Sequence, residues 1–187
     1  MIPLITHTPR LLLLAASRAL LTAELHKPQY FPVLLGAGLP VGWPTTDYDR
    51  AAQEYFLAQL AAGGRTAAGW YNWYALRKAD DAAPRTLVGT GGFLGPPDAA
   101  GAAEINFSLV AEWRGQGLGT ELLAGLVQQA AATGMVRRLL AHPEAGNGAA
   151  RRVLRRNEFA RTGADEDENG RLCFERAVEP TGWQEPS

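Results

Sequence analysis

Residues 104–119 read EINFSLVAEWRGQGLG and join a predicted strand to a predicted helix. In the strand, residues 104–110, apolar and polar side chains alternate with the period of two that a half-buried strand shows. The helix continues to about Thr133 with apolar side chains at helical spacing, and Gly134 is a candidate C-cap. The loop between them, residues 111–117, carries the strongest functional signal in the chain.

Glycine occupies positions 115, 117 and 119 where this loop opens the helix. The first turn of a helix has N–H groups without internal partners, and the helix dipole adds partial positive charge there. Phosphate oxygens can accept from such amides, and glycine removes the Cβ atoms that would hold a pyrophosphate away. Arg114 can add a charge-assisted hydrogen bond. The pattern predicts a pyrophosphate site, and a flexible turn without a ligand is the alternative.

Two other phosphate-binding loops fit this stretch poorly. A Walker loop requires Lys and then Ser or Thr after its last glycine, but Thr120 and Glu121 follow Gly119. A dinucleotide-binding loop that began at Gly115 would need glycine at position 120, and it would begin closer to the end of the strand.

The spacing Arg-x-x-Gly-x-Gly, from Arg114 to Gly119, resembles that of the GCN5-related N-acetyltransferase (GNAT) superfamily. Residues 104–121 are similar to the strand, loop and helix of the RimJ/RimL-like branch, which acetylates the N-termini of ribosomal proteins. Residues 142–159 resemble that branch's second signature. The resemblance spans nearly the whole chain, and its supporting matches are Thr8–Leu11, Leu87–Gly89, Gly92-Phe93, Asn147, Val153-Leu154 and Phe159.

The resemblance implies an open, splayed sheet and transfer of an acetyl group from acetyl-CoA to a primary amine. It implies that the strand end at Leu109 and Val110 contacts the pantetheine arm, which Asn147 also reaches. The pyrophosphate would bind the backbone of Gly115, Gln116, Gly117, Leu118, Gly119 and Thr120. The acceptor would be a polypeptide N-terminus or a small molecule such as an amino acid, a polyamine or an antibiotic.

The chain departs from the family pattern at three positions. Ala111 replaces a frequent proline, and Glu158 stands where glycine usually precedes the phenylalanine. Leu154 occupies the position of a tyrosine that acts as general acid in other branches. The proton donor for the leaving thiolate is therefore unassigned, and a non-catalytic CoA-binding regulatory module is an alternative to an enzyme.

The strand 104–110 also offers a polar face. Glu104, Asn106 and Ser108 alternate with apolar residues and therefore share one side, which suits an acceptor cleft. A protonated amine cannot attack a thioester, so a base must take its proton, and Glu104 is the candidate, directly or through water. The alternatives are that this face meets solvent or that Glu104 pairs with an arginine. Trp43 is expected to lie in a loop that roofs the cleft.

A basic helix face is formed by Arg151, Arg152, Arg155 and Arg156. Such a face is usually a solvated surface. The more specific alternatives are binding of the 3′-phosphate of CoA or of an acidic acceptor.

The remaining patterns predict an α+β (α/β) domain with a mixed, mostly antiparallel sheet flanked by helices. Pro and Gly residues make 28–45 a long irregular loop, and the helix after it has a capping box at 46–49. The other predicted elements are strands at 10–14, 70–76, 85–94 and 137–142, helices at 17–27, 46–62 and 147–157, and a final hairpin that turns at 165–170. For residues 10–14 the start of a helix is the alternative.

Composition limits the classes of protein to consider. The 187 residues are 47% apolar and 20% charged, which suits one globular domain, 1–187, with roughly the last eight residues as a loose tail. The net charge of −1 gives no sign of nucleic-acid or membrane-surface binding, and no segment approaches the ~20 apolar residues of a membrane span. We expect a monomer or homodimer.

Cysteine and histidine argue against a metal or disulfide. Cys173 is the only cysteine, which excludes an internal disulfide and makes a reducing cytoplasm the simplest location. His7, His26 and His142 lack the spacing of metal ligands and are expected to be ordinary surface or packing residues, so no metal is predicted.

Overall fold

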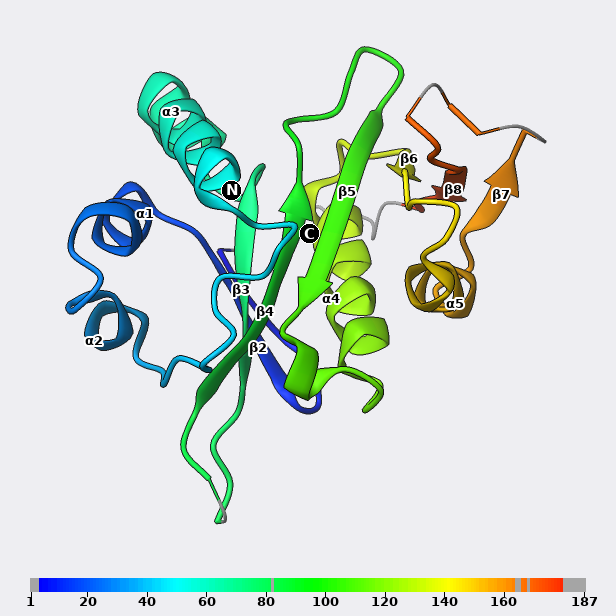
Figure 1. Cartoon of the computed structure of the whole chain (residues 1–187). Helices are drawn as coiled ribbons and strands as arrows, with labels where there is room; N and C mark the ends of the chain where they lie inside the picture. Colours follow the sequence, from blue (N-terminus) through cyan, green and yellow to red (C-terminus); the bar gives the residue numbers. More distant parts are fainter. Residues whose placement is uncertain (1–3, 82, 164–165, 168, 180–187) are drawn as a thin grey trace, which may run out of the picture.

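The computed structural model describes residues 4–81, 83–163, 166–167 and 169–179, and within them eight strands form one sheet in the order β1-β2-β3-β4-β5-β6-β8-β7 (Figure 1). Only the pair β5–β6 is parallel among these strands, which confirms a mixed, mostly antiparallel sheet. The strands are β1 (Ile5–His7), β2 (Leu11–Ala15), β3 (Asn72–Arg77), β4 (Thr86–Phe93), β5 (Ala102–Leu109), β6 (Arg138–Ala141), β7 (Ala160–Thr162) and β8 (Cys173–Ala177).

Helices cover both faces of this sheet. The α-helices are α1 (Arg18–His26), α2 (Phe31–Leu35), α3 (Arg50–Ala67), α4 (Leu118–Thr133) and α5 (Gly148–Arg156), and a short 3-10 helix spans Ala111–Trp113. Figure 1 shows α4 behind β4 and β5, whereas α1, α2 and α3 gather on the other side. Neighbouring residues of β3 show the two sides: the Tyr74 ring packs at a tilt against Phe31 of α2, while Ala75 pairs with Leu13, whose side chain approaches Gly125 of α4.

The sheet opens between β5 and β6. These strands pair only where Ala102–Glu104 meets Arg138–Leu140, and residues 105–109 of β5 pair with β4 alone. The two strands therefore diverge beyond Glu104, which confirms the splayed sheet that the resemblance implied.

Most predicted elements are confirmed, with ends that move by one or two residues. Gly134 adopts the left-handed conformation expected of a C-cap, with φ of 68°, and its N–H bonds to the carbonyl of Ala131. The pairing of β3 with β4 and of β7 with β8 confirms the two predicted hairpins. Part of the predicted turn at 165–170 and the predicted C-terminal tail lie outside the described residues.

The N-terminal half differs from the sequence-based predictions in three places. The segment 28–45 contains α2, which proline starts and which ends at the left-handed Gly36, because burial of Phe31 and Leu35 stabilises one short helix there. Helix α3 begins at Arg50 rather than at position 46, and Asp49 caps it by accepting from Ala52 N. The strand β1, which the sequence pattern did not predict, pairs with β2 at the sheet edge.

Candidate functional site

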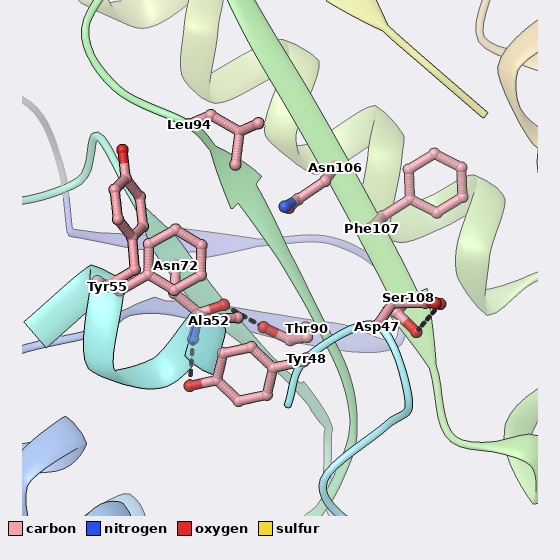
Figure 2. A pocket seen from close by; sticks show the side chains of 11 residues that line it. Asp47, Tyr48, Ala52, Tyr55, Asn72, Thr90, Leu94, Asn106, Phe107 and Ser108 are labelled. Atoms are coloured by element: carbon pink, nitrogen blue, oxygen red, sulfur yellow. Dashed lines mark hydrogen bonds between the residues drawn. The ribbon is translucent and has the colours of Figure 1, made fainter. Parts of the chain in front are cut away.

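Two cavities meet at the end of β5. The α4–α5 cavity, of about 290 Å³, lies between the start of α4, the end of β5 and α5. The α3 cavity, of about 190 Å³, lies between β5, β3 and the start of α3 (Figure 2). Both are lined by Asp47, Phe107 and Ser108. These three residues mark the boundary where a molecule in one cavity would contact a molecule in the other.

The start of α4 presents free backbone donors to the α4–α5 cavity. Gly117 is the N-cap and, having no side chain, caps none of the first-turn amides. Gly115, Gly117, Gly119 and Thr120 all line the cavity. Gly115 and Gly117 have φ of 76° and 80°, so the loop needs glycine there for its backbone conformation as well as for space. A helix start of this kind binds anions.

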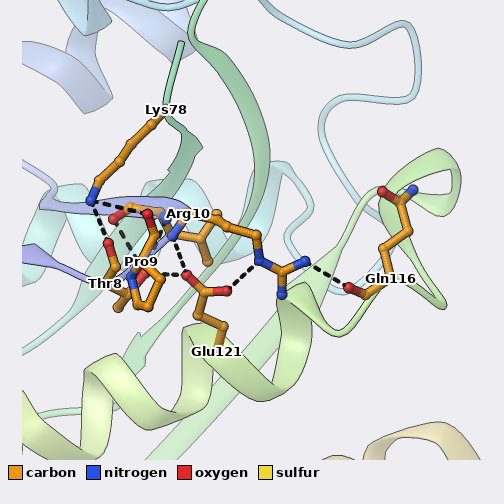
Figure 3. A network of polar contacts seen from close by, with 7 residues as sticks. Thr8, Pro9, Arg10, Lys78, Gln116 and Glu121 are labelled. Atoms are coloured by element: carbon orange, nitrogen blue, oxygen red, sulfur yellow. Dashed lines mark hydrogen bonds and ion pairs between the residues drawn. The ribbon is translucent and has the colours of Figure 1, made fainter. Parts of the chain in front are cut away.

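A polar network holds this loop against the β1–β2 turn (Figure 3). Glu121, in the first turn of α4, accepts from Thr8 Oγ1 and Arg10 N at 2.6 Å each and from Arg10 Nε at 2.7 Å. Arg10 Nη1 also donates to the carbonyl of Gln116 over 2.9 Å. Partial burial raises the pKa of Glu121, but the hydrogen bonds from Thr8 and Arg10 and the Arg10 charge outweigh it, so the pKa lies below its usual value. The ionised carboxylate therefore fixes the glycine loop.

The open edge of β5 supplies further backbone groups. Leu94 N donates to the carbonyl of Glu104, and Val110 N to that of Val88, so the even-numbered residues of β5 bond to β4. Backbone bonding alternates in an antiparallel ladder, which turns the N–H and C=O groups of Phe107 and Leu109 towards the gap with β6. Arg114 Nε accordingly donates to the Leu109 carbonyl over 2.9 Å.

Not every residue predicted for the cofactor lines this cavity. Leu109, Arg114 and Asn147 do, as do the residues at the start of α4 named above, with Gly117 and Gly119 among them. Val110 does not, because its N–H is used by β4 and its side chain is 3% exposed. Gln116 and Leu118 do not line it either, because the Leu118 side chain is buried in the core and the Gln116 side chain donates to the carbonyl of Glu112.

Helix α5 forms the opposite wall. Asn147 is its N-cap, because its Oδ1 accepts from Ala150 N over 2.9 Å, which leaves its Nδ2 as the free donor. Arg152 and Arg156 from the predicted basic face line the cavity. Together with Arg114 they place three guanidinium groups around a site with free amides. Leu154 is 1% exposed, so the position of the family's tyrosine belongs to the core here.

The α3 cavity has aromatic walls and a polar floor. Tyr48, Tyr55, Phe56 and Phe107 line it, and Asn106 and Ser108 point to it from β5 as the alternation predicted (Figure 2). The floor contains Asn72 and Thr90, which are each 4% exposed. Asn72 Nδ2 donates to Tyr48 Oη, and Thr90 Oγ1 donates to Asn72 Oδ1, so these buried polar groups satisfy one another.

A buried carboxylate lies behind the Tyr48 wall. Glu24 of α1 accepts hydrogen bonds from Trp43 Nε1 at 2.8 Å, Tyr48 Oη at 2.9 Å and Tyr74 Oη at 2.6 Å. Burial raises the pKa of Glu24 above its usual value, although these hydrogen bonds oppose the shift. Burial likewise raises the pKa values of Tyr48 and Tyr74, so both keep their protons.

Trp43 occupies this cluster rather than the cleft. Its ring centroid lies 5.3 Å from that of Tyr48, and it lines neither cavity. The structure therefore places it behind the wall, where it holds Tyr48, instead of roofing the acceptor cleft.

Asp47 is the site residue that sequence reasoning missed. It lies directly before Tyr48, lines both cavities and accepts a hydrogen bond from Ser108 Oγ at 3.2 Å. The only sequence signal was its place within the proposed capping box, which gave it a structural role. Because Ser108 is 61 positions away in the chain, the pairing depends on tertiary structure.

Glu104 lies in a separate hollow. Its Oε1 is 3.0 Å from His142 Nδ1, and both residues line an open depression of about 460 Å³ that also contains Leu94, Asp167, Arg171 and Cys173. Its partner is thus a histidine, whereas the sequence suggested solvent or an arginine. Glu104 does not line the α3 cavity, although Leu94 borders both spaces. Its role as a base stays a prediction.

The described residues form no metal-binding cluster and no helix able to span a membrane. No three His, Cys, Asp or Glu side chains among them gather closely enough to hold a metal ion. None of the helices they form is long and apolar enough to cross a bilayer.

A family model described as an acetyltransferase (GNAT) domain matches residues 22–160, which include the glycine loop, all of α5 and the lining of both cavities. A search of curated protein sequences gave no match.

Solved structures share the fold along almost the whole chain. RimL, a ribosomal L7/L12 α-N-protein acetyltransferase in complex with coenzyme A, superposes with a TM-score of 0.61 at 20% identity, over 96% of this chain and 98% of that one. The microcin C7 self-immunity acetyltransferase MccE, in complex with acetyl-CoA and AMP, superposes with a TM-score of 0.60 at 18% identity, over 91% of this chain and 94% of that one. An acetyltransferase from Salmonella typhimurium that modifies the N-terminal serine of ribosomal protein L7/L12 superposes with a TM-score of 0.59 at 18% identity, over 95% of this chain and 99% of that one.

Proposed function

Since this chain belongs to the GNAT family of acetyltransferases, we propose that it moves the acetyl group of acetyl-CoA to a primary amine by direct attack on the thioester. The observation that carries the proposal is the meeting of two cavities at Phe107, Ser108 and Asp47. One cavity offers donors for phosphates and the other offers a small, partly polar space. A two-substrate reaction without a covalent enzyme intermediate requires such a boundary.

The α4–α5 cavity suits the phosphate end of acetyl-CoA. The first-turn amides of α4 and the guanidinium of Arg114 would bind the pyrophosphate, since both supply donors and positive charge. Arg152 and Arg156 would contact phosphate from the opposite wall. The pantetheine arm would bond to the free backbone edge of β5 and to Asn147 Nδ2.

The same strand edge suits the reacting carbonyl. As the amine attacks, the thioester oxygen gains negative charge and needs a fixed donor. The backbone N–H groups of Phe107 and Leu109 point to the open edge and lie beside the cavity boundary. We expect one of them to bind the oxyanion.

The α3 cavity would hold the acceptor. Among its described lining residues, Asp47 is the one acidic side chain, and the rest are aromatic, aliphatic, amide or hydroxyl groups. A polyamine or aminoglycoside, with several cationic groups, would leave charges unpaired in it. The lining therefore favours an acceptor with one ammonium group and a small neighbouring side chain. A polypeptide N-terminus meets that description, as does an amino-acid derivative, and RimL acts on the former.

A thiol-release assay tests the proposal. Acetyl-CoA is offered with peptides of different N-terminal residues, free amino acids and polyamines, and CoA release is followed together with acetylated product. We expect release only with monocationic amines. If the chain binds CoA by calorimetry yet releases no thiol above the hydrolysis rate with the whole panel, the alternative of a non-catalytic CoA-binding module is favoured.

A further inference from the structure

We infer that Asp47 is the catalytic carboxylate that receives the acceptor ammonium and takes its proton, and that Ser108 orients it. The inference deepens the proposed function and rests on it, since it concerns the acceptor half of the same site. It also gives the role of base to a residue different from Glu104, which the strand pattern suggested.

The position of the reaction within the molecule selects Asp47. The acetyl carbon must lie where the two cavities meet, because the thioester reaches it from one side and the amine from the other. Only Asp47, Phe107 and Ser108 line both cavities among the described residues. Of these, Asp47 alone carries a carboxylate, the kind of side chain that can take a proton from an ammonium.

The surroundings of Asp47 fix its carboxylate. Ser108 Oγ donates to Asp47 Oδ2 over 3.2 Å, which leaves Oδ1 for an incoming ammonium. The next residue, Tyr48, donates from its hydroxyl to Glu24, and the backbone N–H of Tyr48 donates to the carbonyl of Thr45. Shortly after it in the chain, Asp49 caps α3. The short segment that carries Asp47 is thus tied to both α1 and α3.

Glu104 lies at the wrong end of the strand for direct proton transfer. It is four residues from Ser108 on β5, and a strand rises about 3.3 Å per residue, which separates them by roughly 13 Å along the strand. Its carboxylate is also occupied by His142 at 3.0 Å. A water chain past Asn106 would be required, whereas Asp47 needs none.

The charges around the boundary separate the two substrates. Arg114, Arg152 and Arg156 line only the α4–α5 cavity, where they attract phosphates and would repel an ammonium. Asp47 faces the α3 cavity as its one described acidic side chain, where it attracts the ammonium. The amine is therefore drawn to the thioester and kept from the phosphate site.

The proton and bond changes balance in this arrangement. The ammonium gives one proton to Asp47, and the nitrogen lone pair then attacks the thioester carbon. In the resulting tetrahedral intermediate the C–S bond breaks, and CoA leaves as a thiolate. The thiolate takes the second proton from the now cationic nitrogen, which yields the amide and CoA thiol, and Asp47 releases its proton to water. No separate acid from the position of Leu154 is needed.

The test uses Asp47→Asn with a matched control, Asp49→Asn. The control removes the same charge two residues away and preserves the cap of α3, since Asn and Asp cap about equally well. Each variant is assayed with the best acceptor of the panel and with a β-fluorinated analogue whose amine is largely unprotonated at the assay pH. CoA affinity is measured by calorimetry.

We expect Asp47→Asn to lower kcat/KM about 100-fold or more with the ordinary amine but less than about tenfold with the fluorinated one, as loss of a general base predicts. CoA affinity should stay within about twofold, and Asp49→Asn should match the wild type. Equal losses with both amines, or none, would overturn the inference. The inference would also be overturned if Glu104→Gln, and not Asp47→Asn, lost kcat/KM selectively with the ordinary amine.

Two outcomes keep this test separate from the proposed function. If the wild-type chain acetylates no amine, the proposed function itself is wrong. If the wild type is active and Asp47→Asn behaves like it, only the role of Asp47 is wrong. If Asp47→Asn fails to bind CoA, Asp47→Ala takes its place with the same two amines and the same criteria.

Discussion

Tyr48 Oη donates a hydrogen bond to Glu24 Oε2 over 2.9 Å and thereby joins the wall of the α3 cavity to a buried carboxylate of α1. Trp43 and Tyr74 donate to the same carboxylate. The cluster therefore supports both the ring of Tyr48 and the adjacent Asp47. The cluster also buries the acidic group of Glu24, which should affect how the stability of the protein depends on pH.

Glu24→Gln should change how stability depends on pH. Burial raises the pKa of Glu24 in the folded state, so the folded chain binds its proton more tightly than the unfolded chain does. This stabilisation is complete below the ordinary glutamate pKa, about 4.3, and is lost as the pH rises through the raised pKa. Between about pH 4 and 8, the denaturant midpoint of the wild type should fall more steeply with rising pH than that of Glu24→Gln. Parallel curves would contradict this, and the exposed Glu112→Gln is the control.

Gly119→Val should weaken CoA binding without straining the backbone. A Cβ at position 119 would meet Leu109 and Val153 only at ordinary distances of 3.5 and 3.6 Å, and φ there is not positive. Larger side-chain atoms would enter the α4–α5 cavity. We expect at least about a tenfold rise in Kd by calorimetry, equivalent to 1.4 kcal/mol. Ala124→Val, on the exposed face of the same helix, should bind normally; equal binding by both variants would remove the phosphate assignment.

Gly117→Val is a harsher test at the same loop. Its φ of 80° is a conformation that valine strongly disfavours, so loss of CoA binding is expected from strain as well as from the blocked amides. Calorimetry that showed unaltered CoA binding would count against the cofactor assignment. Circular dichroism would show whether α4 still forms.

Arg152→Gln and Arg156→Gln should each weaken the binding of CoA but not that of acetylpantetheine, which lacks the phosphates. Both side chains line the α4–α5 cavity, whereas the neighbouring exposed Arg155 does not. A charge-assisted hydrogen bond of roughly 1–2 kcal/mol corresponds to a loss of about 5- to 30-fold at low salt, shrinking as salt is added. Arg155→Gln should leave CoA affinity unchanged. If it lowered CoA affinity as much as Arg152→Gln does, the effect would come from the overall positive charge of α5 and not from direct contacts with phosphate.

Glu121→Gln should reduce stability at neutral pH and lose this effect in acid. Hydrogen bonds and the Arg10 charge lower the pKa of Glu121 despite its partial burial, so its stabilising contribution is present above the unfolded value and is lost as the pH falls through the lowered pKa. At pH 7 we expect a loss of about 1 kcal/mol in the free energy of unfolding, vanishing near pH 3. Glu54→Gln, whose partner Arg50 is exposed, should change little.

The strand and helix around the glycine loop could be predicted because local signals agree there. Alternation in 104–110, glycines at 115 and 117 and a C-cap at Gly134 each act over a few residues, and the structure has the corresponding elements. The 28–45 segment was harder, since its Pro and Gly content hides a five-residue helix whose stability comes from burying Phe31 and Leu35.

The lining of the α3 cavity was predicted less well for the same reason. Asn106 and Ser108 follow from the alternation and do line the α3 cavity. Trp43 and Glu104 were chosen by residue type and approximate location, but their neighbours come from distant elements. Trp43 donates to Glu24 of α1, and Glu104 contacts His142, which directly follows β6.

The sequence by itself determined the fold class, the glycine loop at the start of α4 and the polar face of β5, because backbone geometry and side-chain periodicity are local properties. Only the tertiary structure decided which carboxylate reaches the boundary between the two cavities. Asp47 and Ser108 come from segments 61 positions apart, and what brings them to 3.2 Å is the packing of α3 and its preceding loop against the sheet. No local pattern encodes such a distance, since it depends on how every intervening element packs.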